Sequence, residues 1–417
     1  ADLLRAILMT RAAKEKYHGT SATSEVREFR IRMGMELDLM NLWFGKTADY
    51  FKQFISDPTI GMARINRFDF TTLPINLLYL LYYEYRKNAK ESLNFSFFEY
   101  GKNSNGNPDD DRWEMYLELQ EMYAILQRWY NDKELYHYLG FLFFNFKAQT
   151  PFRDIYTQWK TLNSRDKFLK DIQHTIATRM LDRYLEETEK AAPDYQKCLK
   201  TMTEAISDFR ENWYNNDKEL YQILILLDIF RILDSKSIKK LPTDYFTRKS
   251  GQKDGEDKEH ILSQTPRKDN GEIATIKTDW ERFAQSEDFK DIRSQMQDIL
   301  NHSDAELTEQ ELIQLQNLLN SAGLNSIGNM ALLDLRINRS YGNADYAHKR
   351  TIIFQEYMNQ KYVRPHTLAV FMKGDIDTRE ATGIPLNRWT LEDIKRNTDK
   401  IAKEIGKNFN AWLTQNN

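Results

Sequence analysis

The sequence predicts a mainly α-helical protein. The chain of 417 residues contains only 16 glycines and 9 prolines, which favours long helices over turn-rich β architectures. Apolar residues make up 41% of the chain, and through the first 240 residues they often recur at helical spacing. At roughly 100–200 residues per domain, this length predicts two or three domains.

Residues 1–240 are expected to form an all-α domain. Gly, Asn, Pro and Asp crowd into residues 101–111 without periodicity, which indicates a loop. The apolar spacing predicts helices at 26–42, 47–55, 77–86, 113–131, 133–145, 152–162, 165–185, 195–212 and 218–233.

Two segments of this helical region share a pattern. Trp129-Tyr-Asn-Asp-Lys-Glu-Leu-Tyr136 is echoed by Trp213-Tyr-Asn-Asn-Asp-Lys-Glu-Leu-Tyr221, and an apolar run follows each. Both can be helix starts with an Asn or Asp cap and inward aromatic residues, or they can share a binding role. We favour the first interpretation, because two copies are too few for a solenoid repeat.

Composition excludes several classes of protein. The single cysteine, Cys198, rules out an internal disulfide and a cysteine-based zinc site; it fits a reducing compartment, so we expect a cytoplasmic protein. No apolar run reaches the ~18 residues of a membrane span. The net charge of −3 leaves nucleic-acid binding open.

A domain boundary is expected near residue 240. Helical periodicity stops in residues 235–258, where Lys, Asp and Gly take over. We therefore expect a second domain at 241–417.

Three polar clusters in this second domain carry the chemistry. Glu259 and His260 form the first, residues 325–333 the second, and residues 338–350 the third. Imidazole can deprotonate water near neutral pH, and the hard oxygen ligands of Glu and Asn suit Mg²⁺ or Mn²⁺. Together these residue types match the needs of metal-assisted phosphodiester hydrolysis.

The same clusters resemble a known family. Glu-His-Ile-x-x-Gln from Glu259, Ile-Gly-Asn-x-x-Leu-Leu from Ile327 and Asn-x-Ser-x-Gly-Asn from Asn338 look like the C-terminal nuclease domain of GmrSD-type (type IV) restriction endonucleases. The resemblance implies a ββα-metal (His-Me finger, HNH-like) nuclease domain at 241–417, in which a strand ends at the histidine. The gap of 329 − 260 = 69 residues between His260 and Asn329 is longer than in a minimal finger, and Trp280–Asn320 has the pattern of helices, so we expect inserted helices at about 270–322. Ser263 stands where the family usually has Pro.

The resemblance also implies roles for single residues. His260 matches the general base, Glu259 the adjacent metal ligand, and Asn338 the second metal ligand. Asn329 matches the loop asparagine that orients the histidine. Positions near the substrate phosphate are matched by Arg339, Asn343, Lys349 and Arg350.

The helical half is similar to the same family. The segment from Trp129 to Gly140 resembles its Trp-Tyr-x-Asp-x-x-Leu-Tyr-His-x-x-Gly signature, and residues 1–20 resemble the last helix of its N-terminal sensor domain. The sensor's Asp-Gly-Gln-Gln-Arg nucleotide motif is not found in this sequence. We therefore expect a chain that lacks the NTPase-like sensor domain.

These expectations predict a divalent-metal-dependent DNA endonuclease that acts in phage defence or restriction of modified DNA. Its partners are DNA and a sensor domain or partner subunit, with no membrane. The alternative is a catalytically inactive helical module that binds nucleic acid or a partner. For histidines other than His260 a structural role is the default interpretation, and it applies to His18, His137, His174, His302 and His366.

A local excess of positive charge has two interpretations. Residues 336–364 contain six basic residues and two acidic ones. They can form a phosphate-facing patch or a solvated helix face.

Overall fold

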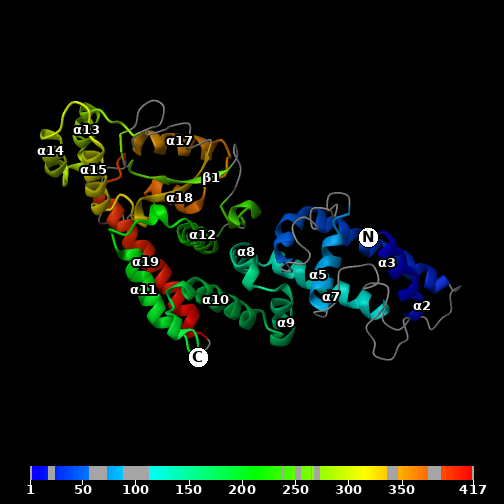
Figure 1. The fold of residues 1–417 in the computed structure, drawn as a ribbon. Coiled ribbons are helices and arrows are strands. Elements are labelled where there is room, and N and C mark those ends of the chain that lie inside the picture. The colour runs from blue at the N-terminus through cyan, green and yellow to red at the C-terminus, as the bar shows by residue number, and fades with distance from the viewer. Residues whose placement is uncertain are drawn as a thin grey trace. The chain divides into compact units, whose positions relative to one another are not determined.

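The structure, a computed structural model, is mainly helical, as predicted (Figure 1). It describes residues 2–16, 24–55, 73–87, 112–236, 239–248, 255–263, 265–266, 273–335, 346–373 and 387–415. The chain forms two compact units, residues 1–172 and 173–417. The boundary expected near residue 240 lies inside the second unit, and each unit is described by itself.

The first unit is entirely helical in its described part. Its elements are α1 (Asp2–Ile7), η1 (Leu8–Ala12), α2 (Ala13–Lys16), α3 (Ser24–Phe51), η2 (Lys52–Phe54), α5 (Asn76–Arg86), α7 (Arg112–Asn131), α8 (Lys133–Asn145), η3 (Lys147–Gln149), α9 (Phe152–Leu162) and α10 (Arg165–Leu181), which contains the division point.

Aromatic side chains form the core of this unit. Phe54 stacks on Phe143 with ring centroids 3.9 Å apart, and Trp129 stacks on Phe168 at 5.6 Å. Asp132 caps α8 by accepting hydrogen bonds from two backbone N–H groups, as the first of the two similar segments predicts. His137 is buried, and its Nδ1 lies 2.6 Å from the Lys133 carbonyl oxygen, which fits its predicted structural role.

The second unit combines helices with two strands. Its elements are η4 (Asp182–Tyr184), η5 (Glu187–Glu189), α11 (Tyr195–Ser207), η6 (Trp213–Asn215), α12 (Asp217–Asp234), η7 (Thr243–Phe246), β1 (Glu256–His260), α13 (Lys277–Ala284), η8 (Glu287–Phe289), α14 (Arg293–Asn301), α15 (Glu309–Ser321), η9 (Ile327–Asn329), β2 (Met330–Asp334), α17 (Tyr346–Met358), α18 (Pro365–Met372) and α19 (Leu391–Thr414).

The two strands form an antiparallel pair although a long stretch of chain separates them. Glu256 pairs with Asp334 at one end and His260 with Met330 at the other. The connecting chain contains α13, α14 and α15, which lie in the stretch of about 270–322 where inserted helices were expected. Trp280, Met296 and Leu315 from these helices join the same buried core as Ala331 of β2.

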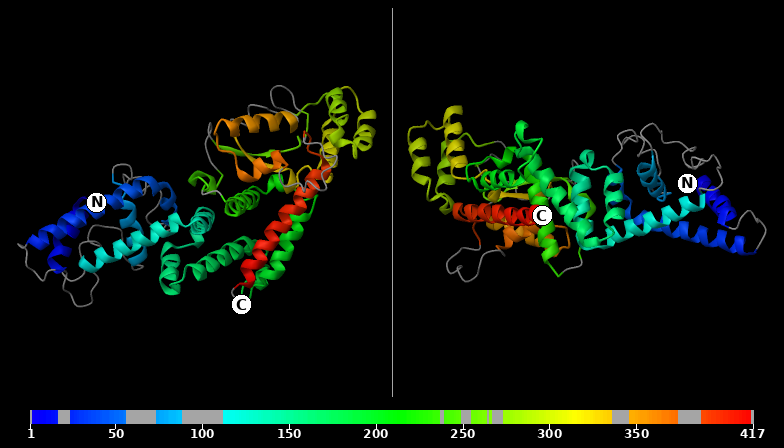
Figure 2. Two further views of the ribbon diagram at one scale, coloured as in Figure 1. Left: turned by 180° about the vertical axis from the view of Figure 1, so that it is seen from behind. Right: turned by 90° about the horizontal axis from the view of Figure 1, so that it is seen from below.

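Helices far apart in sequence support the strand pair. α11 and α19 run side by side in every view (Figures 1 and 2), and α12 contacts α18. The start of α19 contacts η9, where a Cβ on Gly328 would come within 2.3 Å of the Ile394 carbonyl oxygen. Only glycine permits this approach, which fixes the turn that leads into β2. No helix of the described chain is long and apolar enough to cross a membrane.

Candidate active site

The candidate base lies at the C-terminal end of β1. The strand ends at His260, as the finger resemblance implies. The ladder extends one step further, because Ile261 N–H donates to the Asn329 carbonyl oxygen at 2.9 Å. His260 is 9% exposed, so the protein encloses most of the residue.

Two side chains hold the His260 ring. Its Nε2 lies 2.9 Å from Asn325 Oδ1. The Tyr214 ring, from η6, stacks on it with centroids 4.6 Å apart and planes 18° from parallel. Neither contact was predicted, and Tyr214 belongs to the second of the similar segments, for which we favoured a purely structural role.

Asn329 holds the backbone that follows the histidine. Its Nδ2 donates to the carbonyl oxygens of Leu262 at 3.0 Å and Leu324 at 2.9 Å, and its Oδ1 accepts from Leu262 N–H at 2.8 Å. Asn329 is fully buried. It therefore shapes the turn after His260 through the backbone, in a sequence where Ser263 replaces proline, while Asn325 contacts the ring.

Lys349 of α17 joins this site to the helix that follows the strands. Its Nζ donates to Glu259 Oε1 and to the His260 carbonyl oxygen, each at 2.7 Å. Its side chain is 1% exposed, and that of Glu259 is 18% exposed. The lysine thus neutralises the carboxylate beside the base and fixes the end of β1.

Arg350 has a different position from its neighbour. Its Nε donates to the Phe371 carbonyl oxygen at 2.9 Å, and its guanidinium lies over the Phe354 ring. This contact ties α17 to α18. Asn338, Arg339 and Asn343 lie outside the described residues.

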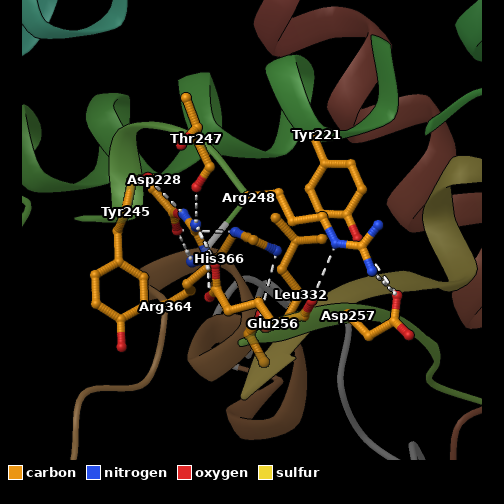
Figure 3. Close-up of polar contacts among 11 residues, drawn as sticks. Tyr221, Asp228, Tyr245, Thr247, Arg248, Glu256, Asp257, Leu332, Arg364 and His366 are labelled. Carbon is orange, nitrogen blue, oxygen red and sulfur yellow. Dashed lines mark hydrogen bonds and ion pairs between the residues drawn. The ribbon is translucent and has the colours of Figure 1, made fainter. Parts of the chain in front are cut away.

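A buried ionic network lies at the other end of β1 (Figure 3). Arg364 donates to both carboxylate oxygens of Glu256 at 2.7 Å and to Asp228 Oδ2 at 2.8 Å. Asp228 Oδ1 also accepts from the backbone N–H of His366 and contacts its Nδ1, both at 2.8 Å. The network connects α12, β1 and the start of α18, and sequence reasoning missed it.

The charges of this network set the ionisation of its members. Burial alone raises the pKa of the Asp228 carboxyl, but His366 and Arg364 outweigh it and hold that pKa below its usual value. The two carboxylates in turn raise the pKa of Arg364 despite its burial. Asp228 therefore stays ionised inside the protein.

No metal cluster is evident in the parts of the chain that the structure describes, where no group of three His, Cys, Asp or Glu side chains could hold an ion. Within those parts Glu259 is the single predicted ligand that can be placed. Its Oε1 contacts Lys349, and its Oε2 makes no hydrogen bond with a described residue. One oxygen of the Glu259 carboxylate is therefore paired with Lys349, and the side chain is partly exposed to solvent.

Comparison with protein families gives a match in this region. Residues 304–404 match the family model described as GmrSD restriction endonucleases, C-terminal domain. The match supports a C-terminal region of the GmrSD restriction endonuclease type. The match includes Asn325, Asn329 and Lys349 and starts after Glu259 and His260. No curated protein and no solved structure matches the chain.

The GmrSD match agrees with the resemblance seen in the sequence. It suggests a nuclease of the restriction endonuclease type. The matched segment contains η9, β2, α17 and α18, the elements that supply Asn329, Lys349 and Arg350. The match therefore covers Asn329 and Lys349 beside His260, and also Arg364 and His366 at the other end of the strand pair.

Proposed function

We propose that the second unit is a divalent-metal-dependent DNA endonuclease of the His-Me finger type, with His260 as general base. The observation that carries this proposal is the position of His260 at the end of β1, with its ring held by two side chains and the carboxylate of Glu259 beside it. The order β1, β2, α17 is the order of a ββα finger. We further propose a role in restriction of modified or phage DNA.

The donor chemistry fits a hard divalent ion. Glu259 would supply a carboxylate oxygen and Asn338 an amide oxygen, and Mg²⁺ or Mn²⁺ accepts a few such ligands with water in the remaining positions. When bound, such an ion supplies charge stabilisation for the phosphate and the leaving oxygen. The partly exposed Glu259 side chain is consistent with this donor set.

The chain's own residues supply the proton transfer. His260 takes a proton from water, the water oxygen forms a bond to phosphorus, and the P–O bond to the leaving oxygen breaks. The electron pair stays on the leaving oxygen, which takes a proton from solvent. Lys349 holds the Glu259 carboxylate and the backbone of His260 in place during these steps.

A second function is favoured by one contact. Because the Lys349 ammonium lies 2.7 Å from Glu259 Oε1, the carboxylate already has a counter-ion. A finger that has lost its metal would bind DNA or a partner without cutting it. The two proposals differ in whether any divalent ion promotes cleavage.

Replacing His260 by alanine tests the proposal. In a plasmid-nicking assay with Mg²⁺ or Mn²⁺, His260→Ala should lose at least about 100-fold in rate, since general-base catalysis contributes about 10²–10⁴-fold. Its circular dichroism spectrum should stay that of the unsubstituted protein. His302→Ala removes an exposed histidine of the same unit and should cut normally.

The other outcomes decide between the two functions. Equal nicking by His260→Ala and the unsubstituted protein would overturn the role of the base. Duplex binding in an anisotropy titration, without nicking in either metal, would favour the binding module.

A further inference from the structure

Helix α3 of the first unit is apolar on two faces. One face, which includes Phe29, Leu37 and Phe44, is buried in the core of the unit. The second face, the α3 stripe, consists of four side chains that are each between 56% and 65% exposed: Ile31, Met35, Leu39 and Leu42. A helix that is apolar on all sides is normally buried on all sides, so the α3 stripe needs a cover that the described part of the unit does not supply.

The α3 stripe is a continuous surface. Its members follow one another at spacings of four, four and three residues, which confines them to an arc of about 80° along about 16 Å of the helix. At the edge of the stripe, Asp38 Oδ2 accepts from Arg5 Nη2 of α1 at 2.9 Å, so this carboxylate already has its counter-ion. A contiguous exposed apolar surface of this kind marks an interaction site.

The two ends of the α3 stripe carry opposite charges. Glu28 lies nine residues before Leu37 and Lys46 nine residues after it, and both side chains are exposed. Helical spacing places both on the face of the stripe, one at each end. Met35 and Leu39 lie two residues before and after the same midpoint. Across this midpoint the apolar residues are therefore symmetrical and the charges are opposite.

Such a surface is complementary to itself in one orientation. In an antiparallel pair with two-fold symmetry, each residue meets the one that lies equally far beyond the centre in the second copy. Glu28 then meets Lys46 of the second copy, and Met35 meets Leu39, and each contact is made twice. A parallel pair would instead place like charges opposite each other at both ends.

We propose that the α3 stripe docks onto the same stripe of a second copy of this chain, as an antiparallel helix pair. The occupant is a second copy because the positions and charges of the stripe match their own two-fold image, which a different partner would not require. A single helix pair lies at or below about 1,200 Å², the lower end of stable interfaces, so association should depend on concentration. The proposal goes beyond the proposed function and does not rest on it.

Sedimentation velocity of the full chain at about 1 to 100 µM, a range that covers weak association, tests the proposal. The mass should rise from that of the 49.6 kDa monomer toward twice this value. The double variant Met35→Glu, Leu39→Glu should associate at least about 10-fold more weakly, because it removes apolar contacts and places carboxylates against each other. Ile313→Glu is the control, since Ile313 is 47% exposed in the second unit, and it should associate normally.

Charge reversal tests the antiparallel orientation. Glu28→Lys alone and Lys46→Glu alone should each weaken self-association by about 3-fold or more at low ionic strength. An equimolar mixture of these two variants should associate as tightly as the unsubstituted protein, because each variant supplies the charges that the other lacks. Both positions are exposed, so both variants should keep the circular dichroism spectrum of the unsubstituted protein.

Three results would overturn the proposal. The first is a monomer at every concentration, since the stripe would then be covered by something other than a second copy. The second is association that the Met35→Glu, Leu39→Glu variant leaves unchanged, because another surface would then carry it. The third is a mixture of the two charge variants that associates no better than either alone. None of these measurements uses nicking, so failure of the proposed nuclease activity would leave them unaffected.

Discussion

Lys349 shows how a buried charge can serve a site. Its ammonium is almost fully enclosed, which costs free energy unless the charge is paired and hydrogen-bonded. Glu259 supplies the charge and the His260 carbonyl oxygen supplies a second acceptor. The two contacts that offset the free-energy cost of burying the lysine also fix the end of β1, which carries the proposed base.

Removing this charge should be costly. Lys349→Met leaves Glu259 without its partner, although partial exposure lets water compensate, so we expect a loss of about 1–3 kcal/mol in the free energy of unfolding. Urea denaturation measures it. Lys361→Met is the control, because Lys361 is an exposed member of an ion pair with Glu356 and such pairs contribute about 0–1 kcal/mol. Equal losses in the two variants would contradict the role of burial.

Part of this site could be predicted from the sequence. Glu259, His260 and Lys349 were predicted as site residues, and the structure brings them together, because adjacent residue types and an ordered motif leave a recognisable pattern. Tyr214 and Asn325 come to the same ring from distant positions, and a lone tyrosine or asparagine has no spacing that marks it. Asn329 was assigned to the histidine, yet only the fold shows that it acts on the backbone of Leu262.

At the scale of elements, one ionic network joins three segments. Arg364 pairs with the carboxylates of both Asp228 and Glu256. His366 contacts Asp228 through its backbone N–H and its Nδ1, and Thr367 Oγ1 donates to the Leu332 carbonyl oxygen of β2. The carboxylates of this network are thus paired, as a buried network requires.

The depressed pKa of Asp228 predicts how stability depends on pH. Its ionised form is stabilised only in the folded protein, so this contribution is fully present above the unfolded pKa of about 3.9. It is lost as pH falls through the lower folded pKa. Asp228→Asn should lower the free energy of unfolding by about 3 kcal/mol at pH 7.

Denaturation from pH 7 down to pH 2 checks the sign. The free energy of unfolding of Asp228→Asn should approach that of the unsubstituted protein only below about pH 4. Asp399→Asn, at an exposed position of α19, should follow the unsubstituted protein throughout. A cost that stays constant to pH 2 would mean that Asp228 is not ionised in the folded state.

The contact between η9 and α19 depends on a missing side chain. An alanine Cβ at Gly328 would meet the Ile394 carbonyl oxygen and Thr398 Oγ1, both within 2.3 Å. Gly328→Ala should therefore destabilise the protein by about 1–3 kcal/mol, measured by urea denaturation. Gly45 lies within helix α3, where a Cβ comes no closer than 3.6 Å to Pro74; Gly45→Ala should be neutral or stabilising by up to about 1 kcal/mol. A neutral Gly328→Ala would refute the close packing of η9.

Sequence periodicity predicts where the helices and strands lie more readily than it predicts the side-chain contacts that hold them together. The inserted helices and the strand that ends at His260 were expected, because apolar spacing and the motif lie within short windows of sequence. The ionic network was not, since Asp228, Glu256 and Arg364 lie far apart in the chain. A buried salt bridge has no local pattern, and nothing in the sequence around His366, for which a structural role was the default interpretation, indicates Asp228 as its partner.

At the scale of the whole molecule, the chain contains two compact units. The aromatic core that contains Trp129 and Phe168 belongs to the first. The core that contains Trp280, Ala331 and Phe371 belongs to the second. Separate cores often open with different free energies, in cooperative groups of neighbouring elements.

Hydrogen exchange should show this independence. Arg364→Met leaves two buried carboxylates unpaired, which should cost about 3–5 kcal/mol and raise amide exchange in β1, β2, α12 and α18. Exchange in α7 and α8 should stay unchanged within error. The reciprocal variant is Asp132→Ala, which removes the α8 cap and the ion pair of Asp132 with Arg165. It should lower the free energy of opening of α8 by about 1 kcal/mol, which raises amide exchange in α8, and it should leave exchange in β1 and β2 unchanged. Mass spectrometry of peptides from both variants measures each unit in one experiment. A rise in α7 and α8 equal to that in the strands after Arg364→Met would mean that both cores open together.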